Sequence, residues 1–158
     1  MDELTTTRRW IERFRATVER KTAGLEPEQL AERAVPPSTL SPLGLVRHLA
    51  QLEHHWFVRV LQRSDEAQLF CDPTWDTQFD GAVGTPECVE EAFTAWRTAC
   101  ERADAFLDQL PDEALDVEIG DGDIATIRDV FLQVLQEYAR HSGHLDLLRE
   151  RIDGQTGE

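Results

Sequence analysis

Apolar residues recur at intervals of three and four in four stretches of the chain, a pattern that predicts four amphipathic helices. The predicted helices span about residues 7–23, 42–63, 86–110 and 126–151. In the first, Trp10, Phe14 and Val18 share one face, and Gly24 follows where a helix would end. The pattern therefore favours an all-α fold, with four helices long enough to form a bundle.

Turn chemistry separates these helices. Ser41-Pro42 and Thr85-Pro86 each combine a capping hydroxyl with a proline at the first helical position, where its missing N–H carries no cost. The connection over residues 25–40 holds three prolines and one short helical turn from Pro27 to Leu30. Two further long connections, 64–85 and 112–123, are acidic, and the second is predicted to contain a short extended segment. Long connections allow a bundle that is not a simple up-down-up-down arrangement.

Length and charge limit the function classes. The 158 residues suit one domain, which we expect to span 1–158. The 16 basic and 31 acidic residues give a net charge of −15, which disfavours nucleic-acid and anionic-membrane partners. Because the chain contains no apolar run of about eighteen residues and its first ten residues are polar, we expect a cytoplasmic protein.

The three cysteines do not form a recognisable framework. Cys71, Cys88 and Cys100 are an odd number, and their spacing matches neither a zinc knuckle nor a disulfide pattern. We expect them to be free thiols.

The fourth predicted helix carries polar side chains within its apolar stripe. At about 100° per residue, Glu137, His141 and His144 fall on the same arc as Val134 and Leu145. A carboxylate that faces a bundle interior loses its hydration. This loss costs roughly several kcal/mol unless another group compensates the charge. Glu137 and His141 are one turn apart, a spacing at which bundle helices present carboxylate and imidazole to a metal.

The second predicted helix offers further imidazoles. His48 lies at the edge of its apolar stripe, where it is either a hydrogen-bonded boundary residue or a metal ligand. His55 follows two turns later on the same face, as a pocket wall or a helix-packing residue, whereas His54 points elsewhere and is expected to be solvated. If the second and fourth helices are neighbours, His48, Glu137 and His141 form a site with two nitrogen ligands and one oxygen ligand. Such a site suits Zn²⁺, with Fe²⁺, Ni²⁺ and Mn²⁺ as alternatives, and leaves coordination positions open.

These residues also carry a family resemblance. The stretch from Ser41 to Leu49, followed by Trp56-Phe57, and the stretch from Glu137 to Gly154 resemble the DinB/YfiT-like superfamily. The branch that they most resemble contains mycothiol-dependent enzymes. The resemblance covers about residues 4–158, nearly the whole chain.

The resemblance implies an up-down-down-up four-helix bundle that forms homodimers. It also implies a divalent metal held by a histidine of the second helix and two residues of the last. Many relatives have His-x-x-x-His at the last pair, whereas this chain has Glu137 at the first of these positions, as the mycothiol-dependent maleylpyruvate isomerase branch does. His144 is then an alternative ligand or a partner of the ligands.

The function implied is that of a metal-dependent transferase that delivers a low-molecular-weight thiol, mycothiol or a similar one, to an electrophilic small molecule. A divalent cation deprotonates a coordinating thiol at neutral pH and so supplies a nucleophile. His55, Arg59 and Trp75 are expected to line the pocket. Two alternatives use the same residues: a stress-associated bundle that binds a metal or small ligand without turnover, and a metal-dependent hydrolase.

Overall fold

The computed structural model describes the backbone of residues 2–72, 75–120 and 122–157, and the side chains of these residues except 72, 75, 76 and 112. Its elements are α1 (Glu3–Thr22), α2 (Pro27–Leu30), α3 (Pro42–Glu53), the π-helix η1 (His54–Val60), β1 (Cys71–Asp72), β2 (Trp75–Asp76), α4 (Pro86–Leu107), the 3-10 helix η2 (Asp112–Asp116) and α5 (Ile127–Asp153). The predicted all-α class is confirmed, with one two-residue antiparallel hairpin inside the connection over 64–85. The connection over 112–123 contains η2 and a single bridge between Glu118 and Thr126.

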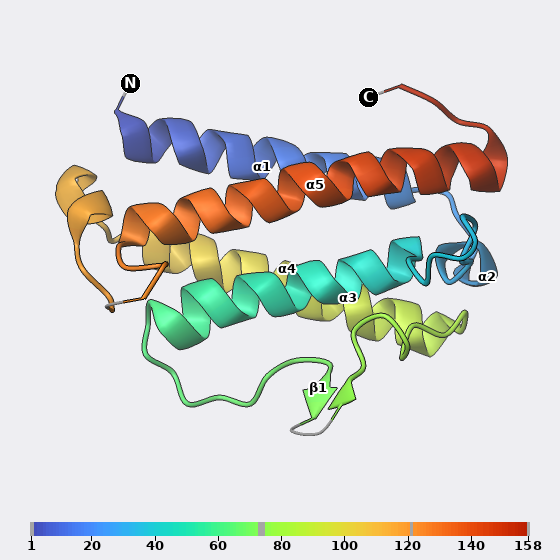
Figure 1. Ribbon diagram of the computed structural model, residues 1–158, viewed down its shortest axis with the longest axis horizontal. Coiled ribbons are helices and arrows are strands. Elements are labelled where there is room, and N and C mark those ends of the chain that lie inside the picture. The colour runs from blue at the N-terminus through green and yellow to red at the C-terminus, as the bar shows by residue number, and fades with distance from the viewer. Residues whose placement is uncertain (1, 73–74, 121, 158) are drawn as a thin grey trace.

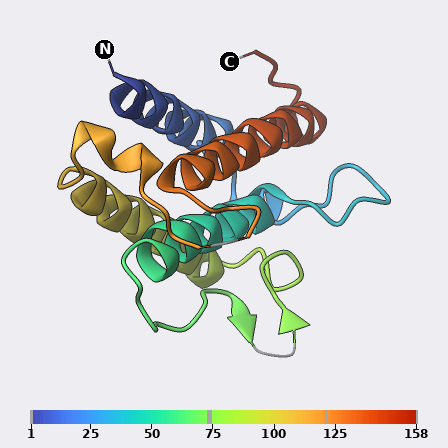
Figure 2. The same ribbon diagram turned by 60° about the vertical axis from the view of Figure 1, so that its left-hand side comes forward.

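The four long helices form two layers. In Figure 1, α1 and α5 make the upper layer and α3 and α4 the lower one, and the turned view in Figure 2 shows the same pairs. α1 packs chiefly on α5, α3 packs chiefly on α4, and α3 also contacts α5. Followed along the chain, α1 and α5 run from left to right in Figure 1, whereas α3 and α4 run from right to left.

Side-chain caps define where the long helices begin. The side chains of Asp2, Ser41, Thr85 and Thr126 each accept a hydrogen bond from the backbone N–H three residues later. Such a cap satisfies one of the donors that a helix start leaves unpaired. With Asp2 as its cap, α1 begins at Glu3, four residues before the start at residue 7 that the apolar pattern predicts. The pattern misses these residues because the first turn of α1 is mostly polar.

The second predicted helix changes its winding halfway. An α-helix over 42–63 was expected, but after Glu53 the chain continues as the π-helix η1, in which hydrogen bonds reach one residue further back. The wider turn redirects the side chains beyond residue 53, so a phase of 100° per residue no longer holds. The expectation that His54 is solvated is wrong, because the connection after η1 covers it: His54 is 4% exposed and its Nε2 lies 3.0 Å from the carbonyl oxygen of Ala67.

A charged pair lies inside the otherwise apolar core. Glu53, which is fully buried, receives two hydrogen bonds from Arg15 of α1, at 2.8 and 2.9 Å. The Tyr138 hydroxyl of α5 donates to the same carboxylate at 2.7 Å and accepts from Trp96 Nε1 of α4 at 2.9 Å. All four layered helices therefore contribute to one network, which compensates the cost of burying the Glu53 charge.

α1 and α4 face each other across a seam that ion pairs bridge. The pairs are Arg8 with Asp108, Arg15 with Asp104, and Glu19 with Arg97. α1 and α4 are not among the element pairs that pack extensively. The apolar packing of the bundle is thus concentrated in the other three seams.

The prediction of free thiols is confirmed for Cys88 and Cys100, and all three cysteines are partly buried. Burial, with a contribution from the charge of Glu53, raises the pKa of the Cys100 thiol and keeps it protonated. Among the described residues, no helix combines the length and the apolar character needed to cross a bilayer.

Candidate metal centre

Three potential ligands meet where α3 faces α5. The ligand atoms of His48 from α3 and of Glu137 and His141 from α5 all lie within 4.8 Å of one another. The α-helical winding of α5 places Glu137 and His141 one turn apart on one face, and the packing of α3 against α5 brings His48 opposite them.

One carboxylate oxygen is the centre of the cluster. Glu137 Oε2 lies 3.3 Å from His48 Nε2 and 3.2 Å from His141 Nε2. The side chains of His48, Glu137 and His141 are 22%, 12% and 9% exposed, respectively, so the cluster is shielded but reachable from solvent. Arg140 Nη1, 3.5 Å from the other Glu137 oxygen, lies on the outer side.

The far nitrogens of both imidazoles have partners of their own. His48 Nδ1 lies 2.9 Å from Gln78 Oε1, and because an amide oxygen only accepts, Nδ1 must carry the proton. The other ring nitrogen of His48, Nε2, then faces Glu137. His141 Nδ1 lies 3.1 Å from His144 Nδ1, so one of these two nitrogens donates to the other.

Burial keeps His141 neutral. Loss of hydration, and next the repulsion of His48, lower the pKa of His141 to about 4, against the opposing attraction of Glu137. The cluster therefore brings a carboxyl oxygen and two Nε2 atoms together at a common point. This donor set fits a divalent cation, and its composition matches that of three-ligand zinc sites.

The other predicted site residues lie outside this cluster or beside it. His144 is half-buried and touches His141 rather than the shared Glu137 oxygen. His55 contacts Gln68, at 3.5 Å, and Trp56, and Arg59 has a buried Nε without a hydrogen-bond partner among the described residues. Both belong to η1, and their described contacts do not join them to the cluster. The side chain of Trp75 lies outside the described residues.

No sequence pattern pointed to Gln78. It lies in the connection after the β-hairpin, 8% exposed, and its amide nitrogen donates to Cys71 Sγ at 3.2 Å. Arg47, next to the candidate ligand His48, holds this segment by donating to the carbonyl oxygens of Gln78 and Thr77, at 3.0 and 3.3 Å. Phe79 of the same segment stacks on the His48 ring, with centroids 5.3 Å apart. The connection thus supports His48 from the side opposite Glu137.

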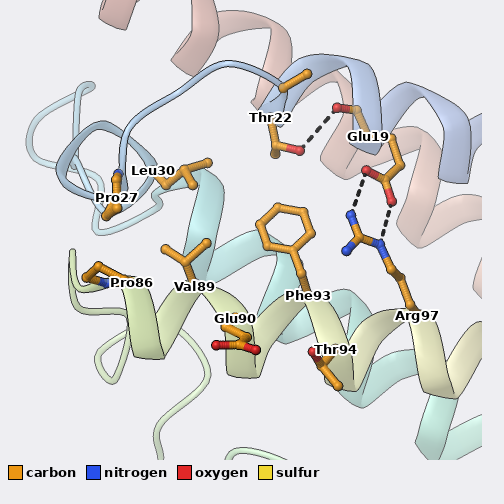
Figure 3. A pocket seen from close by; sticks show the side chains of 11 residues that line it. Glu19, Thr22, Pro27, Leu30, Pro86, Val89, Glu90, Phe93, Thr94 and Arg97 are labelled. Atoms are coloured by element: carbon orange, nitrogen blue, oxygen red, sulfur yellow. Dashed lines mark hydrogen bonds and ion pairs between the residues drawn. The ribbon is translucent and has the colours of Figure 1, made fainter.

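A large cavity lies elsewhere. It measures about 580 Å³ and is bounded by the end of α1, α2 and the first half of α4, with Leu30, Val89 and Phe93 among its walls. Figure 3 shows Glu19 and Arg97 paired at one end of it. None of the three clustered ligands lines this cavity, so its size alone does not identify the reactive centre.

Comparison with known proteins identifies the family. A family model described as mycothiol-S-transferase matches residues 6–154, nearly the whole chain. No curated protein and no solved structure matches the chain. The match confirms the resemblance to the mycothiol-dependent branch of the DinB-like proteins, which was inferred from the segments that contain His48, Glu137 and His141. The chain belongs to the mycothiol-S-transferase family.

Proposed function

We propose that the protein is a metal-dependent transferase that joins a low-molecular-weight thiol, mycothiol or a close analogue, to an electrophilic small molecule. The family supports the thiol and the transfer reaction. The single observation that carries the metal dependence is the convergence of His48, Glu137 and His141 within 4.8 Å. The reaction forms a sulfur–carbon bond, releases the leaving group of the electrophile, and gives the thiol proton to solvent.

His48 Nε2, Glu137 and His141 Nε2 would hold the ion. A divalent ion there supplies the positive charge that favours the thiolate form of a bound thiol. Three protein ligands leave coordination positions open, as in catalytic zinc sites. Zn²⁺ suits the two-nitrogen, one-oxygen set, with Ni²⁺, Fe²⁺ and Mn²⁺ as alternatives.

Neighbouring side chains orient the ligands. Gln78 holds His48 in the form that presents Nε2, and Phe79 stacks on its ring. His144 contacts Nδ1 of His141, a position from which it orients the ring or replaces Glu137 as a ligand. Partners of this kind fix the direction of metal-binding histidines. His55, Arg59 and Trp75 remain proposed pocket residues.

Other features implied by the family resemblance complete the proposal. The bundle has up-down-down-up connectivity, which the helix directions in Figure 1 support. The chain forms one domain over 1–158, and one apolar core formed by all four long helices supports this. The protein functions as a homodimer in the cytoplasm.

Elemental analysis tests the centre. Protein expressed with supplemented metal should contain close to one divalent ion per chain, and a Glu137→Ala, His141→Ala double variant should contain almost none. Glu150→Ala, which removes an exposed acid from the same helix, is the matched control and should retain the ion. A wild-type protein without metal after this treatment would contradict the proposal.

A thiol-consumption assay tests the reaction. With mycothiol and monochlorobimane, the metal-loaded protein should form the bimane thioether with release of chloride, and the double variant should not accelerate it. Equal rates for both proteins would contradict the transferase and favour a bundle that binds without turnover. Turnover of an ester or amide without thiol would instead indicate a hydrolase.

A further inference from the structure

Arg47, the residue before the candidate ligand His48 on α3, is a buried charge whose hydrogen bonds go mainly to a loop. Its Nε donates to the carbonyl oxygen of Gln78 at 3.0 Å, and its Nη2 donates to that of Thr77 at 3.3 Å. The residue is 5% exposed, and its guanidinium carbon lies 4.0 Å from the centroid of the Phe70 ring. A rigid guanidinium can bind two successive carbonyl oxygens at once, whereas an ammonium group lacks this fork. Arg47 therefore anchors the connection after the β-hairpin to α3.

The anchored segment, residues 77–81, forms a turn that contacts the His48 imidazole. Gln78 Oε1 lies 2.9 Å from His48 Nδ1, and the Phe79 ring stacks on the imidazole with an angle of 26° between the ring planes. Arg47 and His48 are consecutive on α3, so the side chain that anchors the 77–81 turn and the side chain that the turn contacts belong to one helix. A shift of the turn away from Arg47 would move both of these partners of His48.

Two glycines allow the 77–81 turn to lie this close to α3. The Gly81 N–H closes the turn by donating to the Thr77 carbonyl oxygen at 2.9 Å. A Cβ on Gly81 would lie only 2.6 Å from that oxygen and 2.8 Å from Arg47 Nη2. On α3, a Cβ on Gly44 would lie 3.2 Å from the Phe79 ring, and glycine inside a helix is destabilising relative to alanine. The fit between the turn and α3 is thus supported by observations besides the hydrogen bonds of Arg47.

We propose that Arg47 is a positioning residue of the metal centre. By fixing the 77–81 turn on α3, it holds Gln78 and Phe79 against the His48 imidazole and so fixes the direction of Nε2. Partners that orient a metal-binding histidine raise the affinity of the site, because the ligand atom already points at the ion. The inference rests on the proposed metal dependence and deepens it: the affinity for the ion depends on a buried arginine that is not a ligand.

The affinity for Zn²⁺, measured by competition with a chromophoric chelator, tests this role. Arg47→Lys keeps the charge but loses the fork, and it should weaken Zn²⁺ binding about tenfold, the lower end of the usual cost of removing a group that orients a metal-binding histidine. Arg149→Lys is the matched control, because Arg149 is equally buried and donates to the carbonyl oxygens of Lys21 and Ala23, at 3.1 and 2.7 Å. This control should leave the affinity unchanged while it lowers the unfolding temperature. Equal weakening of Zn²⁺ binding by both variants would overturn the proposal.

A double-mutant cycle separates positioning from stability. If Arg47 acts through Gln78, adding Arg47→Lys to Gln78→Leu should weaken Zn²⁺ binding further by about twofold or less, since residues of one hydrogen-bond network do not act additively. Additive losses would overturn the proposal. If Arg47→Lys fails to fold, Gly81→Ala replaces it, because its Cβ would displace the turn from the guanidinium. Gly122→Ala, whose Cβ would meet no atom within 4 Å, is the control for that variant and should bind Zn²⁺ as the wild type does.

Failure of this inference can be told from failure of the proposed function. A wild-type protein that binds no Zn²⁺ would contradict both the metal centre and the role of Arg47. A wild-type protein that binds Zn²⁺, together with an unchanged dissociation constant in folded Arg47→Lys, would overturn the role of Arg47 alone.

Discussion

Gln78 determines which nitrogen of His48 faces Glu137. Its amide nitrogen donates to Cys71 Sγ, which leaves Oε1 to accept from His48 Nδ1. The lone pair of His48 Nε2 is thereby directed at the place where an ion would bind. The binding property of one imidazole thus depends on an amide 30 residues further along the chain.

Replacing Gln78 by leucine should weaken metal binding about 10- to 100-fold, the usual cost of removing such a partner of a metal-binding histidine. Competition with a chromophoric chelator measures the dissociation constant. Gln109→Leu changes an exposed glutamine on another part of the surface and should have no effect. A dissociation constant in Gln78→Leu equal to that of the wild type would show that the hydrogen bond does not orient His48.

His141 makes the metal-free protein sensitive to acid. Because burial lowers its pKa to about 4 from the ordinary value of 6.5, the unfolded chain takes up a proton below pH 6.5 that the folded chain takes up only near pH 4. Stability is therefore unaffected by this residue above pH 6.5 and falls as the pH decreases through that window. Between pH 7 and pH 5 the loss from His141 should be about 2 kcal/mol.

Urea unfolding of the metal-free protein at the two pH values measures this loss of stability. In His141→Gln, the loss between pH 7 and pH 5 should be about 2 kcal/mol smaller than in the wild type. Burial also lowers the pKa of His54 and of His55, so part of the acid sensitivity will persist in the variant. An identical pH dependence in the wild type and the variant would contradict the assignment.

At the scale of elements, the buried pair of Glu53 and Arg15 joins α3 to α1. Glu53→Ala should cost about 3–5 kcal/mol of unfolding free energy, because it leaves the Arg15 guanidinium in the core without its main partner. Glu19→Ala breaks the exposed pair that links α1 to Arg97 of α4 and should cost about 1 kcal/mol or less. Denaturant unfolding measures the free energy of unfolding of both variants. Similar losses in Glu53→Ala and Glu19→Ala would contradict a larger cost for breaking the buried pair.

Helical periodicity explains which parts of the site could be predicted from the sequence. α5 is a regular α-helix from Ile127 to Asp153, so a phase of 100° per residue correctly placed Glu137 and His141 on one inward face. The same calculation placed His48 at the edge of its stripe, which agrees with its partial burial. It failed for His54, because the connection after η1 covers that side chain through Ala67, and helical phase carries no information about a connection.

Contacts made by connections could not be predicted in this way. Gln78 lies in an irregular segment, and its position depends on Arg47 binding two backbone carbonyl oxygens of that segment. A hydrogen bond between a loop amide and a helix histidine leaves no periodic signal. The network of Arg15, Glu53 and Tyr138 was missed as well, because burial of charged residues contradicts the binary pattern on which the helix predictions rest.

At the scale of the whole molecule, a bound ion would connect the two layers, since His48 belongs to the lower layer and the other two ligands to the upper one. Binding to the folded chain alone should add about 2.7 kcal/mol at a free metal concentration 100 times the dissociation constant. For a chain of this size that corresponds to a rise of about 5–10 °C in the unfolding temperature. Calorimetry with and without metal measures the rise, and the Glu137→Ala, His141→Ala variant should show none.

The weak packing between α1 and α4 also affects how long a metal ion would stay bound. α1 and α4 each have one extensively packed long-helix neighbour, whereas α3 and α5 lie between two. Fraying of α1 or α4 during thermal fluctuation would therefore leave all three coordinating side chains in place. Residence of the ion should therefore be insensitive to the motions of the two outer helices.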